Sequence, residues 1–333
     1  MTARHLARAR RLLAQAILAA GLAGMVGAPP AAAEPLRLFI LGTASLAGTY
    51  YAAGRAICRS INAEGPDALR CSPEPTPGSQ YNLRALEAGE LEFAFVQSDW
   101  QHKAYEGTGP FAGAPVAALR SVMSLYAEAV TLVVRAEAGI AAVEDLAGKA
   151  VDLGAPASAR RGTTDRVLRG IGVDPASFGR RAELTSAAVG PELCAGRIDA
   201  AFLVIGHPSA LVADLLQRCA LRLVPLEGPQ ARRFVAGSAD FETFVIPAGS
   251  YGPAPEAVRT VSTLATLVTR ADVADDLVDH VARTVIARYD ALADQVPALG
   301  RRHLAQMRKA GLTAPLHPAA AAAFDGAQAG GGE

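Results

Sequence analysis

The chain has 333 residues, of which 51% are hydrophobic and 19% charged, so it is long enough for one large domain or two ordinary ones. Its formal net charge is 0, and the charge falls to about −4 once the first 33 residues, which hold four Arg and no acid, are removed. This balance argues against a nucleic acid partner, because proteins that bind nucleic acids concentrate positive charge.

The first 33 residues have the pattern of a secretory signal peptide. Four arginines precede an apolar run from Leu12 to Val26, and three alanines suited to cleavage precede Glu34. A membrane anchor is the weaker alternative, because the run is short, is interrupted by Gly, and has no Cys near its end for lipid attachment. We therefore expect cleavage after residue 33 and a mature protein that is a free periplasmic monomer.

The mature part opens with a predicted strand, a small-residue loop and a helix. The apolar run LRLFIL (36–41) leads into GTASLAGTYYAAGRAICR (42–59). A loop of this kind after a strand usually presents backbone N–H groups to an anion at a helix N-terminus. It has neither the Gly-Lys-Ser/Thr ending of a P-loop nor the GxGxxG spacing of a dinucleotide site, so the pattern predicts neither of these.

Two later segments share one pattern. Residues 83–99 contain L-x-A-G-E-L-E-x-A-F, and residues 192–208 contain L-x-A-G-R-I-D-x-A-F. Each reads as a helix end, a Gly turn and a buried strand with polar residues at its carboxyl end. A strand that runs into a small-residue loop precedes each of them, at 38–45 and at 150–158. The recurrence predicts two similar α/β lobes, although the pattern alone is also that of a common helix-to-strand joint.

The remaining segments complete the predicted lobes. A strand within 124–140 is expected to leave the first lobe, and the chain is expected to return near 241–252. Residues 255–299 are expected to be mostly amphipathic helix, and the Ala- and Gly-rich tail, 320–333, to fray at its end. The predicted fold class is α/β with a ligand cleft between two lobes. Lobe 1 comprises 34–125 plus 245–333, and lobe 2 comprises 126–244.

Four cysteines remain after the signal peptide, and an even number in an exported protein favours two disulfides. Three connectivities are possible. We prefer the pairs Cys58–Cys71 and Cys194–Cys219, because each closes a short loop within one repeat unit. A metal site built from all four is not favoured, because the sequence has no CxxC spacing.

A series of motifs resembles the TAXI-type solute receptors of TRAP transporters. These motifs are LGTASLAGTYYAAG (41–54), TPGSQYNL (76–83), GELEFAFVQSDW (89–100) and DLAGKAVDLGAPASA (145–159), with further matches as far as residue 319. The resemblance covers essentially all of the chain after residue 36. It implies a type II periplasmic-binding-protein fold and the membrane subunits of a TRAP permease as partners. Two departures are Pro77, where the family turn usually has Gly, and Ala157, which with two arginines replaces a small GSG-type loop.

The loops named above are rich in Ser, Thr, Asn, Gln and backbone N–H groups, which suits a hydrogen-bonding cage for a carboxylate. The resemblance implies glutamate, 2-oxoglutarate or a four-carbon dicarboxylate. In lobe 1 the predicted ligand-binding residues are Thr43, Ser45, Thr49, Tyr50, Gly78, Ser79, Asn82, Gln97, Ser98 and Asp99. In lobe 2 they are Ser158, Arg160, Arg161, Thr163 and His207.

Several of these residues also have an ordinary structural interpretation. Asp99 is equally suited to capping a helix that starts near Trp100. Arg160 or Arg161 would clamp a second carboxylate of the ligand, but both also fit a solvated surface. His207 precedes a proline at a strand end, where a histidine more often orders a loop than reacts.

The sequence offers little for catalysis. None of the histidines after the signal peptide has HExxH or HxH spacing, and there is no GxSxG elbow. Ser98, Asp99 and His102 are close in sequence, yet no pattern identifies an activated nucleophile. We therefore predict a binding protein with no catalytic residue, metal or cofactor. The alternative roles are a ligand sensor that feeds a sensor kinase and, less favoured, a periplasmic enzyme.

Overall fold

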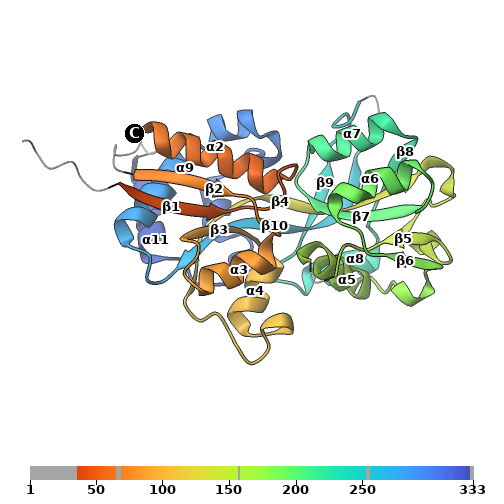
Figure 1. Ribbon diagram of the computed structural model, residues 1–333, viewed down its shortest axis with the longest axis horizontal. Coiled ribbons are helices and arrows are strands. Elements are labelled where there is room, and N and C mark those ends of the chain that lie inside the picture. The colour runs from red at the N-terminus through yellow and green to blue at the C-terminus, as the bar shows by residue number, and fades with distance from the viewer. Residues whose placement is uncertain (1–35, 65–68, 157, 253–255, 331–333) are drawn as a thin grey trace, which may run out of the picture. The chain divides into compact units, whose positions relative to one another are not determined.

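A computed structural model describes residues 36–64, 69–156, 158–252 and 256–330, so the predicted signal peptide lies outside the described residues. Within these ranges the strands form one continuous sheet (Figure 1). They are β1 (Arg37–Gly42), β2 (Leu69–Glu74), β3 (Phe93–Gln97), β4 (Leu119–Arg135), β5 (Ala150–Asp152), β6 (Arg180–Ala182), β7 (Ala200–Ile205), β8 (Leu221–Val224), β9 (Glu242–Ile246) and β10 (Val258–Arg270). The order is β2-β1-β3-β10-β4-β7-β5-β6, with β8 paired to β4 and β9 paired to β10.

Helices cover this sheet. They are α2 (Thr49–Glu64), α3 (Ser79–Glu87), α4 (Ser98–Glu106), α5 (Ala159–Gly170), α6 (Ser186–Cys194), α7 (Ala210–Arg218), α8 (Pro229–Ala236), α9 (Asp275–Gln295), α10 (Leu304–Lys309) and α11 (Pro318–Gly330). Short 3-10 helices lie at Gly109–Phe111, Ala136–Ala138, Val143–Leu146, Pro175–Ser177 and Pro297–Leu299. None of the helices in the described ranges combines the length and apolarity needed to cross a bilayer.

The two halves of the sheet repeat one topology. In the first half β1 lies between β2 and β3, both parallel to it, and β10 runs antiparallel beside β3. In the second half β5 lies between β6 and β7, both parallel to it, and β4 runs antiparallel beside β7. Strands β3 and β7 begin at equivalent positions within the two repeated sequence patterns. The two-lobe α/β fold class expected from those patterns is therefore confirmed.

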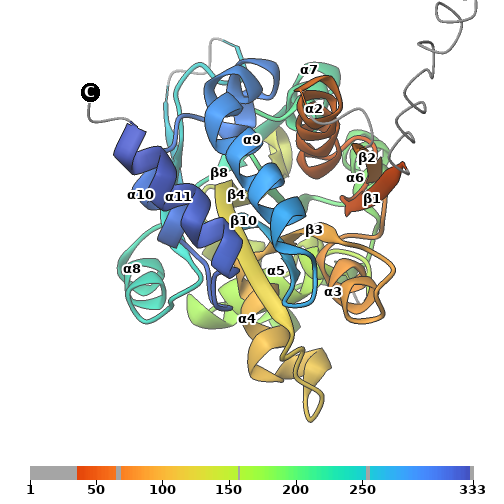
Figure 2. The same ribbon diagram turned by 90° about the vertical axis from the view of Figure 1, so that its left-hand side faces the viewer.

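Each half has helices on both faces of its part of the sheet. In the first half one core joins α2, α9 and α11 to the sheet, and a second core joins α3 and α4 to the opposite face. In the second half α5 and α8 pack on one face, and α6 and α7 pack on the other. Figure 2 shows α9 and α11 side by side over the first half. Because both faces are covered, the central strands are apolar on both sides.

Strands β4 and β10 run through both halves, as Figure 1 shows. Along β4 the first core ends at Tyr126 and the second begins at Val130. Along β10 the change falls between Val261 and Ala265. We propose that the lobe boundaries lie at these points, which puts the return to lobe 1 later than the expected residue 245.

The expectation of mostly helix over residues 255–299 is wrong for its first part. Residues Val258–Arg270 form β10, and helix α9 begins only at Asp275. The sequence VRTVSTLATLVTR is rich in β-branched residues, which favour a strand. Both faces of β10 are buried, so no polar alternation marks it as a strand in the sequence.

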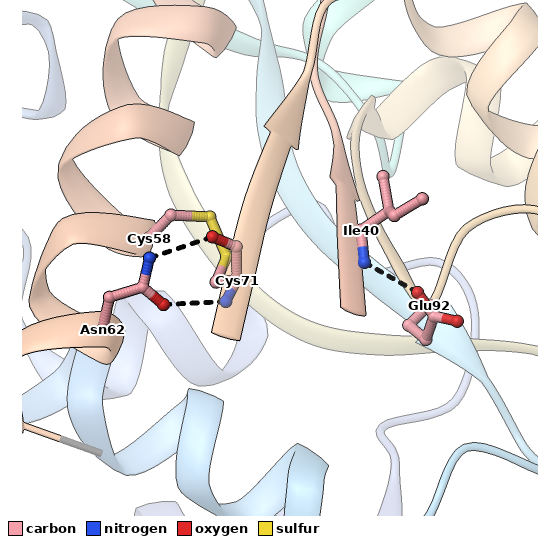
Figure 3. The surroundings of a disulfide bond; sticks show 5 residues. All are labelled: Ile40, Cys58, Asn62, Cys71 and Glu92. Atoms are coloured by element: carbon pink, nitrogen blue, oxygen red, sulfur yellow. Dashed lines mark hydrogen bonds between the residues drawn. A yellow bond between two sulfur atoms is a disulfide. The ribbon is translucent and has the colours of Figure 1, made fainter. Parts of the chain in front are cut away.

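The two predicted disulfides, Cys58–Cys71 and Cys194–Cys219, are confirmed. Their Cα atoms are 5.0 and 5.5 Å apart, which is within the usual range for a disulfide. The first links α2 to the edge strand β2 (Figure 3). Beside it Asn62 Nδ2 donates to the Cys71 carbonyl at 3.0 Å, and its Oδ1 accepts from the Cys71 N–H at 2.8 Å. The side-chain amide thus takes the place of a further strand along this edge.

Candidate functional site

A cavity of about 690 Å³ opens where the two halves of the sheet meet. This volume is in the range of pockets that hold small molecules. Its described walls come from the first half at 44–45, 47–50, 76–81, 84, 97 and 128, and from the second half at 155–156, 158–160, 184–187, 203–205 and 211. The strand-to-helix loops after β1 and β5 lie on opposite sides of it, as the repeat predicts for carboxyl ends of strands.

Four helices begin at this cavity. Residues that line it include the first-turn residues Thr49 of α2, Ser79 of α3, Ala159 of α5 and Ser186 of α6. The first N–H groups of a helix have no partner within the helix, and the helix dipole adds partial positive charge there. The convergence of four such ends favours a negatively charged group in the cavity.

The loop before α3 depends on a glycine. Gly78 has φ 103° and ψ −160°, a conformation that residues with a Cβ rarely adopt. Its N–H donates to Thr76 Oγ1 at 3.1 Å. Pro77, the departure from the family turn, also lines the cavity. The turn exposes the start of α3 to the cavity without a side-chain cap.

Glu128 on β4 lines the cavity and was not predicted from the sequence. Tyr50 OH donates to its Oε2 at 2.6 Å. Burial raises the pKa of the Glu128 carboxyl to about 8; the Tyr50 hydrogen bond lowers it, the nearby Asp99 raises it and a Gln97 hydrogen bond lowers it. In the sequence the residue lies inside a long apolar run, SLYAEAVTLVV, where a lone acid was the only available signal.

Eight of the predicted ligand-binding residues line the cavity: Ser45, Thr49, Tyr50, Gly78, Ser79, Gln97, Ser158 and Arg160. The other seven lie outside its lining: Thr43, Asn82, Ser98, Asp99, Arg161, Thr163 and His207. The ligand contacts of all fifteen stay predictions, and the polar atoms of these seven bind other parts of the protein in the structure.

Thr43 and Asn82 form hydrogen bonds that connect the loops after β1 and β2. Asn82 Nδ2 donates to the carbonyls of Thr43 and Phe95, both at 2.8 Å, and its Oδ1 accepts from Thr76 at 2.7 Å. Thr43 Oγ1 donates to the Glu74 carbonyl at 2.7 Å. Both side chains are fully buried, so they hold the loops after β1 and β2 together.

Asp99 and Thr163 connect α4 to α5. Thr163 Oγ1 donates to Asp99 Oδ2 at 2.8 Å, and Lys103 Nζ lies 3.2 Å from the same oxygen. Trp100 Nε1 donates to the Ala159 carbonyl at 3.1 Å. Helix α4 begins at Ser98, so Asp99 lies in its first turn and is not its N-cap residue.

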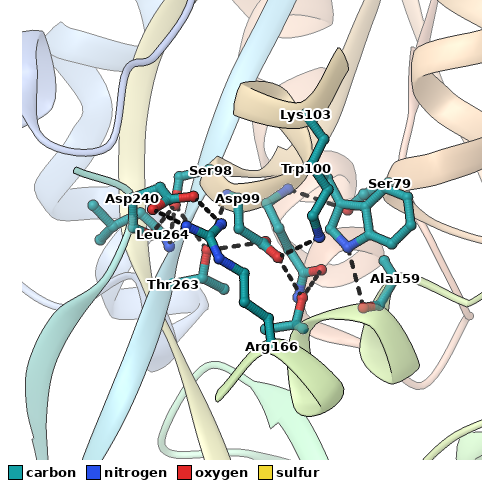
Figure 4. Close-up of polar contacts among 12 residues, drawn as sticks. Ser79, Ser98, Asp99, Trp100, Lys103, Ala159, Arg166, Asp240, Thr263 and Leu264 are labelled. Carbon is teal, nitrogen blue, oxygen red and sulfur yellow. Dashed lines mark hydrogen bonds and ion pairs between the residues drawn. The ribbon is translucent and has the colours of Figure 1, made fainter. Parts of the chain in front are cut away.

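Ser98 and Asp240 extend this network toward β10. Ser98 Oγ donates to the Asp240 carbonyl at 2.8 Å and lies 2.7 Å from Thr263 Oγ1. The Asp240 carboxylate is paired with Arg166 of α5, with one contact at 2.9 Å (Figure 4). Ser98 is thus held by structural partners, none of which is His102.

The two arginines that were candidates for a carboxylate clamp are both paired within the protein. Arg160 Nη1 donates to Asp152 Oδ2 at 2.7 Å and to the Phe202 carbonyl at 2.8 Å. Arg161 donates to Asp165 at 2.8 Å and to Glu183 at 2.7 Å. Arg160 contributes to the cavity wall, and Arg161 lies outside the cavity lining.

His207 is buried beside the second half of the cavity. Its Nε2 lies 2.7 Å from Thr131 Oγ1, and its Nδ1 contacts Tyr251 OH. Burial lowers the pKa of His207 to about 4, so the ring is neutral at pH 7. Tyr251 OH also accepts from the Ser209 N–H at 2.7 Å. His207 therefore orders the loop after β7, which agrees with the structural interpretation.

Several solved structures have a similar fold. A protein from Bordetella bronchiseptica RB50 is 14% identical, with a TM-score of 0.50 over 88% of each chain. The periplasmic aliphatic sulphonate binding protein SsuA from Escherichia coli is 14% identical, with a TM-score of 0.49 over 87% of this chain and 83% of its own. The ligand binding component of an ABC-type import system from Staphylococcus aureus is 11% identical, with a TM-score of 0.49 over 86% of this chain and 89% of its own. At such identities the likeness concerns the fold alone.

A family model provides the assignment by sequence. The model, described as the NMT1-like family, matches residues 41–326. The match begins at the last residues of β1 and ends within α11, so it includes both halves of the sheet and every segment that lines the cavity. This protein belongs to the NMT1-like family.

Proposed function

We propose that this protein is a periplasmic solute receptor that binds a small carboxylate in the cavity and delivers it to a TRAP-type permease. The observation that carries the proposal is the meeting of four helix N-termini at one cavity between two lobes. Such a site binds an anion through backbone N–H groups without a free basic side chain. The motif resemblance supports the permease as partner, and the leader pattern supports export.

The site is built for binding. Its described walls offer backbone N–H groups, hydroxyls and amides. The two arginines that line them, Arg84 and Arg160, are paired with acids of the protein. Because β4 and β10 continue through both lobes, bending of these strands would let the lobes close on a ligand. Glutamate, 2-oxoglutarate and four-carbon dicarboxylates are the first ligands to test.

Calorimetry and thermal unfolding of the exported protein with these carboxylates test the proposal. A ligand at about 100 times its dissociation constant should raise the free energy of unfolding by ~2.7 kcal/mol. Uptake by cells that carry the permease should require the receptor. If only neutral or cationic solutes stabilise the protein, the carboxylate assignment is wrong.

Ser79→Ala is the first variant to measure. Ser79 Oγ accepts from the Gln97 N–H at 3.1 Å, and both residues line the cavity. Loss of the hydroxyl should weaken carboxylate binding by ~1 kcal/mol or more, because the start of α3 loses its attachment to β3. Ser177→Ala, on an exposed turn away from the cavity, is the control and should bind as the wild type does. Equal affinities for all three proteins would remove Ser79 from the site.

A further inference from the structure

Glu128 is the one carboxyl among the described residues that line the cavity. Glu128 is only 5% exposed. The two arginines in the walls are bound to other acids, Arg84 to Glu87 at 3.1 Å and Arg160 to Asp152 at 2.7 Å. The described walls therefore hold a buried acid and offer it no cation. Burial without a cation makes ionisation of this carboxyl costly, and a ligand that brings a positive charge to it would offset that cost.

The groups around Glu128 come from each element packed against it. Tyr50 of α2 donates a hydrogen bond to it, Gln97 of β3 is close enough to lower its pKa, and Asp99 of α4 raises that pKa. On β10 the residue opposite is Thr263, whose hydroxyl lies 2.7 Å from Ser98 Oγ. These neighbours give Glu128 hydrogen-bonding groups and a nearby negative charge. A positive charge on the ligand would give its carboxylate a partner of opposite charge.

The carboxyl also lies next to the helix N-termini that favour an anion. Tyr50, which holds Glu128, is the second residue of α2. Gln97, its neighbour on β3, is attached to Ser79, the first residue of α3. A negative group and two positive helix ends thus share one wall of the cavity. A molecule with an ammonium beside a carboxylate matches this wall on both counts.

We propose that the ligand is an α-amino acid whose ammonium binds the Glu128 carboxylate and whose carboxylate faces the starts of α2 and α3. The proposal rests on the proposed function and narrows its ligand class. The opposite wall includes Leu203, Val204 and Ile205, against which the rest of the ligand would pack. A carboxylate without an amine leaves the Glu128 carboxyl without a cationic partner and forms no charge pair with it, so it should bind more weakly.

Matched ligand pairs that differ only in the α-amino group test this directly. The pairs are glutamate with glutarate, and leucine with 4-methylpentanoate, titrated calorimetrically into the exported protein. At least one amino acid should bind roughly 30-fold or more tightly than its amine-free partner, because a buried charge pair is made with one and not with the other. Glu128→Gln should remove that preference. Glu64→Gln, the same substitution at the exposed far end of α2, should keep it.

Proton release gives a second readout. At pH 7 the carboxyl of the empty site is largely protonated, and an ammonium would ionise it. Titrations in two buffers with different ionisation enthalpies should show proton release by the wild type and none by Glu128→Gln. If Glu128→Gln fails to fold, the matched pairs titrated into the wild type keep the test decisive: the amino acid should release a proton and its amine-free partner should release none.

The outcomes separate the two proposals. If amine-free carboxylates bind as tightly as the amino acids and Glu128→Gln leaves the ratio unchanged, the amino acid proposal is overturned while the carboxylate receptor stands. If no carboxylate of either kind binds, the proposed function is overturned together with it.

Discussion

The raised pKa of Glu128, a residue of the cavity wall, makes the free energy of unfolding depend on pH. The folded protein keeps its carboxyl protonated up to about pH 8, whereas a Glu in the unfolded chain ionises near the ordinary value of 4.5. Between these pH values the folded state binds more protons than the unfolded state. The contribution of the neutral carboxyl is fully present below pH 4.5, and the free energy of unfolding falls as pH rises toward 8.

Glu128→Gln should therefore change the pH dependence of stability. Gln stays neutral and still offers Tyr50 an acceptor, so the variant should match the wild type near pH 4.5. At pH 8 it should be more stable by up to about 4 kcal/mol. Urea unfolding at several pH values measures the difference. Parallel curves for the two proteins would contradict a buried neutral carboxyl.

At the scale of elements, the start of α3 depends on the backbone of the preceding residue. Gly78 has φ 103°, and a Cβ built there would meet only Ala44 Cβ, at 3.9 Å. The obstacle to a side chain is thus conformational strain and not lack of space. This makes the turn a sensitive test of whether the exposed first turn of α3 serves the site.

Gly78→Ala should destabilise the protein by about 1–3 kcal/mol, because the backbone must either strain or move. The same change should weaken ligand binding, since the start of α3 shifts with the turn. Gly237→Ala is the control, because Gly237 has φ −90° and room for a Cβ. Thermal unfolding of both variants measures the difference. A similar loss of stability in both would show that the backbone conformation of Gly78 is not required for folding.

The second disulfide joins two helices of lobe 2. Cys194 ends α6, and Cys219 follows α7, with 25 residues of sequence separation. Replacing both cysteines by serine should cost about 2–4 kcal/mol, since the unfolded chain regains the freedom of that loop. Urea unfolding of the variant beside the oxidised wild type measures this. Peptide mapping without reductant should recover the pairs 58–71 and 194–219, and any cross pair would contradict the structure.

At the scale of the whole molecule, the two lobes share strands β4 and β10 and also touch beside the cavity. Thr163 of α5 and Asp99 of α4 provide a hydrogen bond of 2.8 Å across this contact. The Asp99 side chain is fully buried, so a lost hydrogen bond there is not replaced by water. The contact is therefore expected to contribute to the stability of both lobes.

Thr163→Val should lower the free energy of unfolding by about 1–3 kcal/mol, because the buried Asp99 carboxylate loses a donor. Thr164→Val is a matched control on the same helix turn. Thr164 is also buried, but its hydroxyl has no hydrogen-bond partner among the described residues, so Val there should be neutral or stabilising. Chemical unfolding of the two variants distinguishes them, and equal losses would argue against the bond to Asp99.

Local sequence patterns predicted much of the architecture of this protein. The repeated joint at 83–99 and 192–208 predicted the duplicated topology, and short spacings predicted the disulfides, because both depend on residues near one another in the chain. The small-residue loops likewise predicted where helices begin beside the cavity. Strand β10 was missed because burial on both faces removes the alternation that identifies a strand.

Which polar residues face the cavity depends on contacts between segments that lie far apart in the chain. Tyr50 and Glu128 are 78 positions apart, and their bond exists because β4 crosses the sheet beside the start of α2. Arg160 resembled a free clamp in the sequence, yet the fold places Asp152 within 2.7 Å of it. Asn82, Asp99 and Thr163 suited ligand contacts by type, but the packing of loops and helices surrounds them with backbone and side-chain partners. Burial and long-range pairing assign these roles, and neither is encoded in the spacing of neighbouring residues.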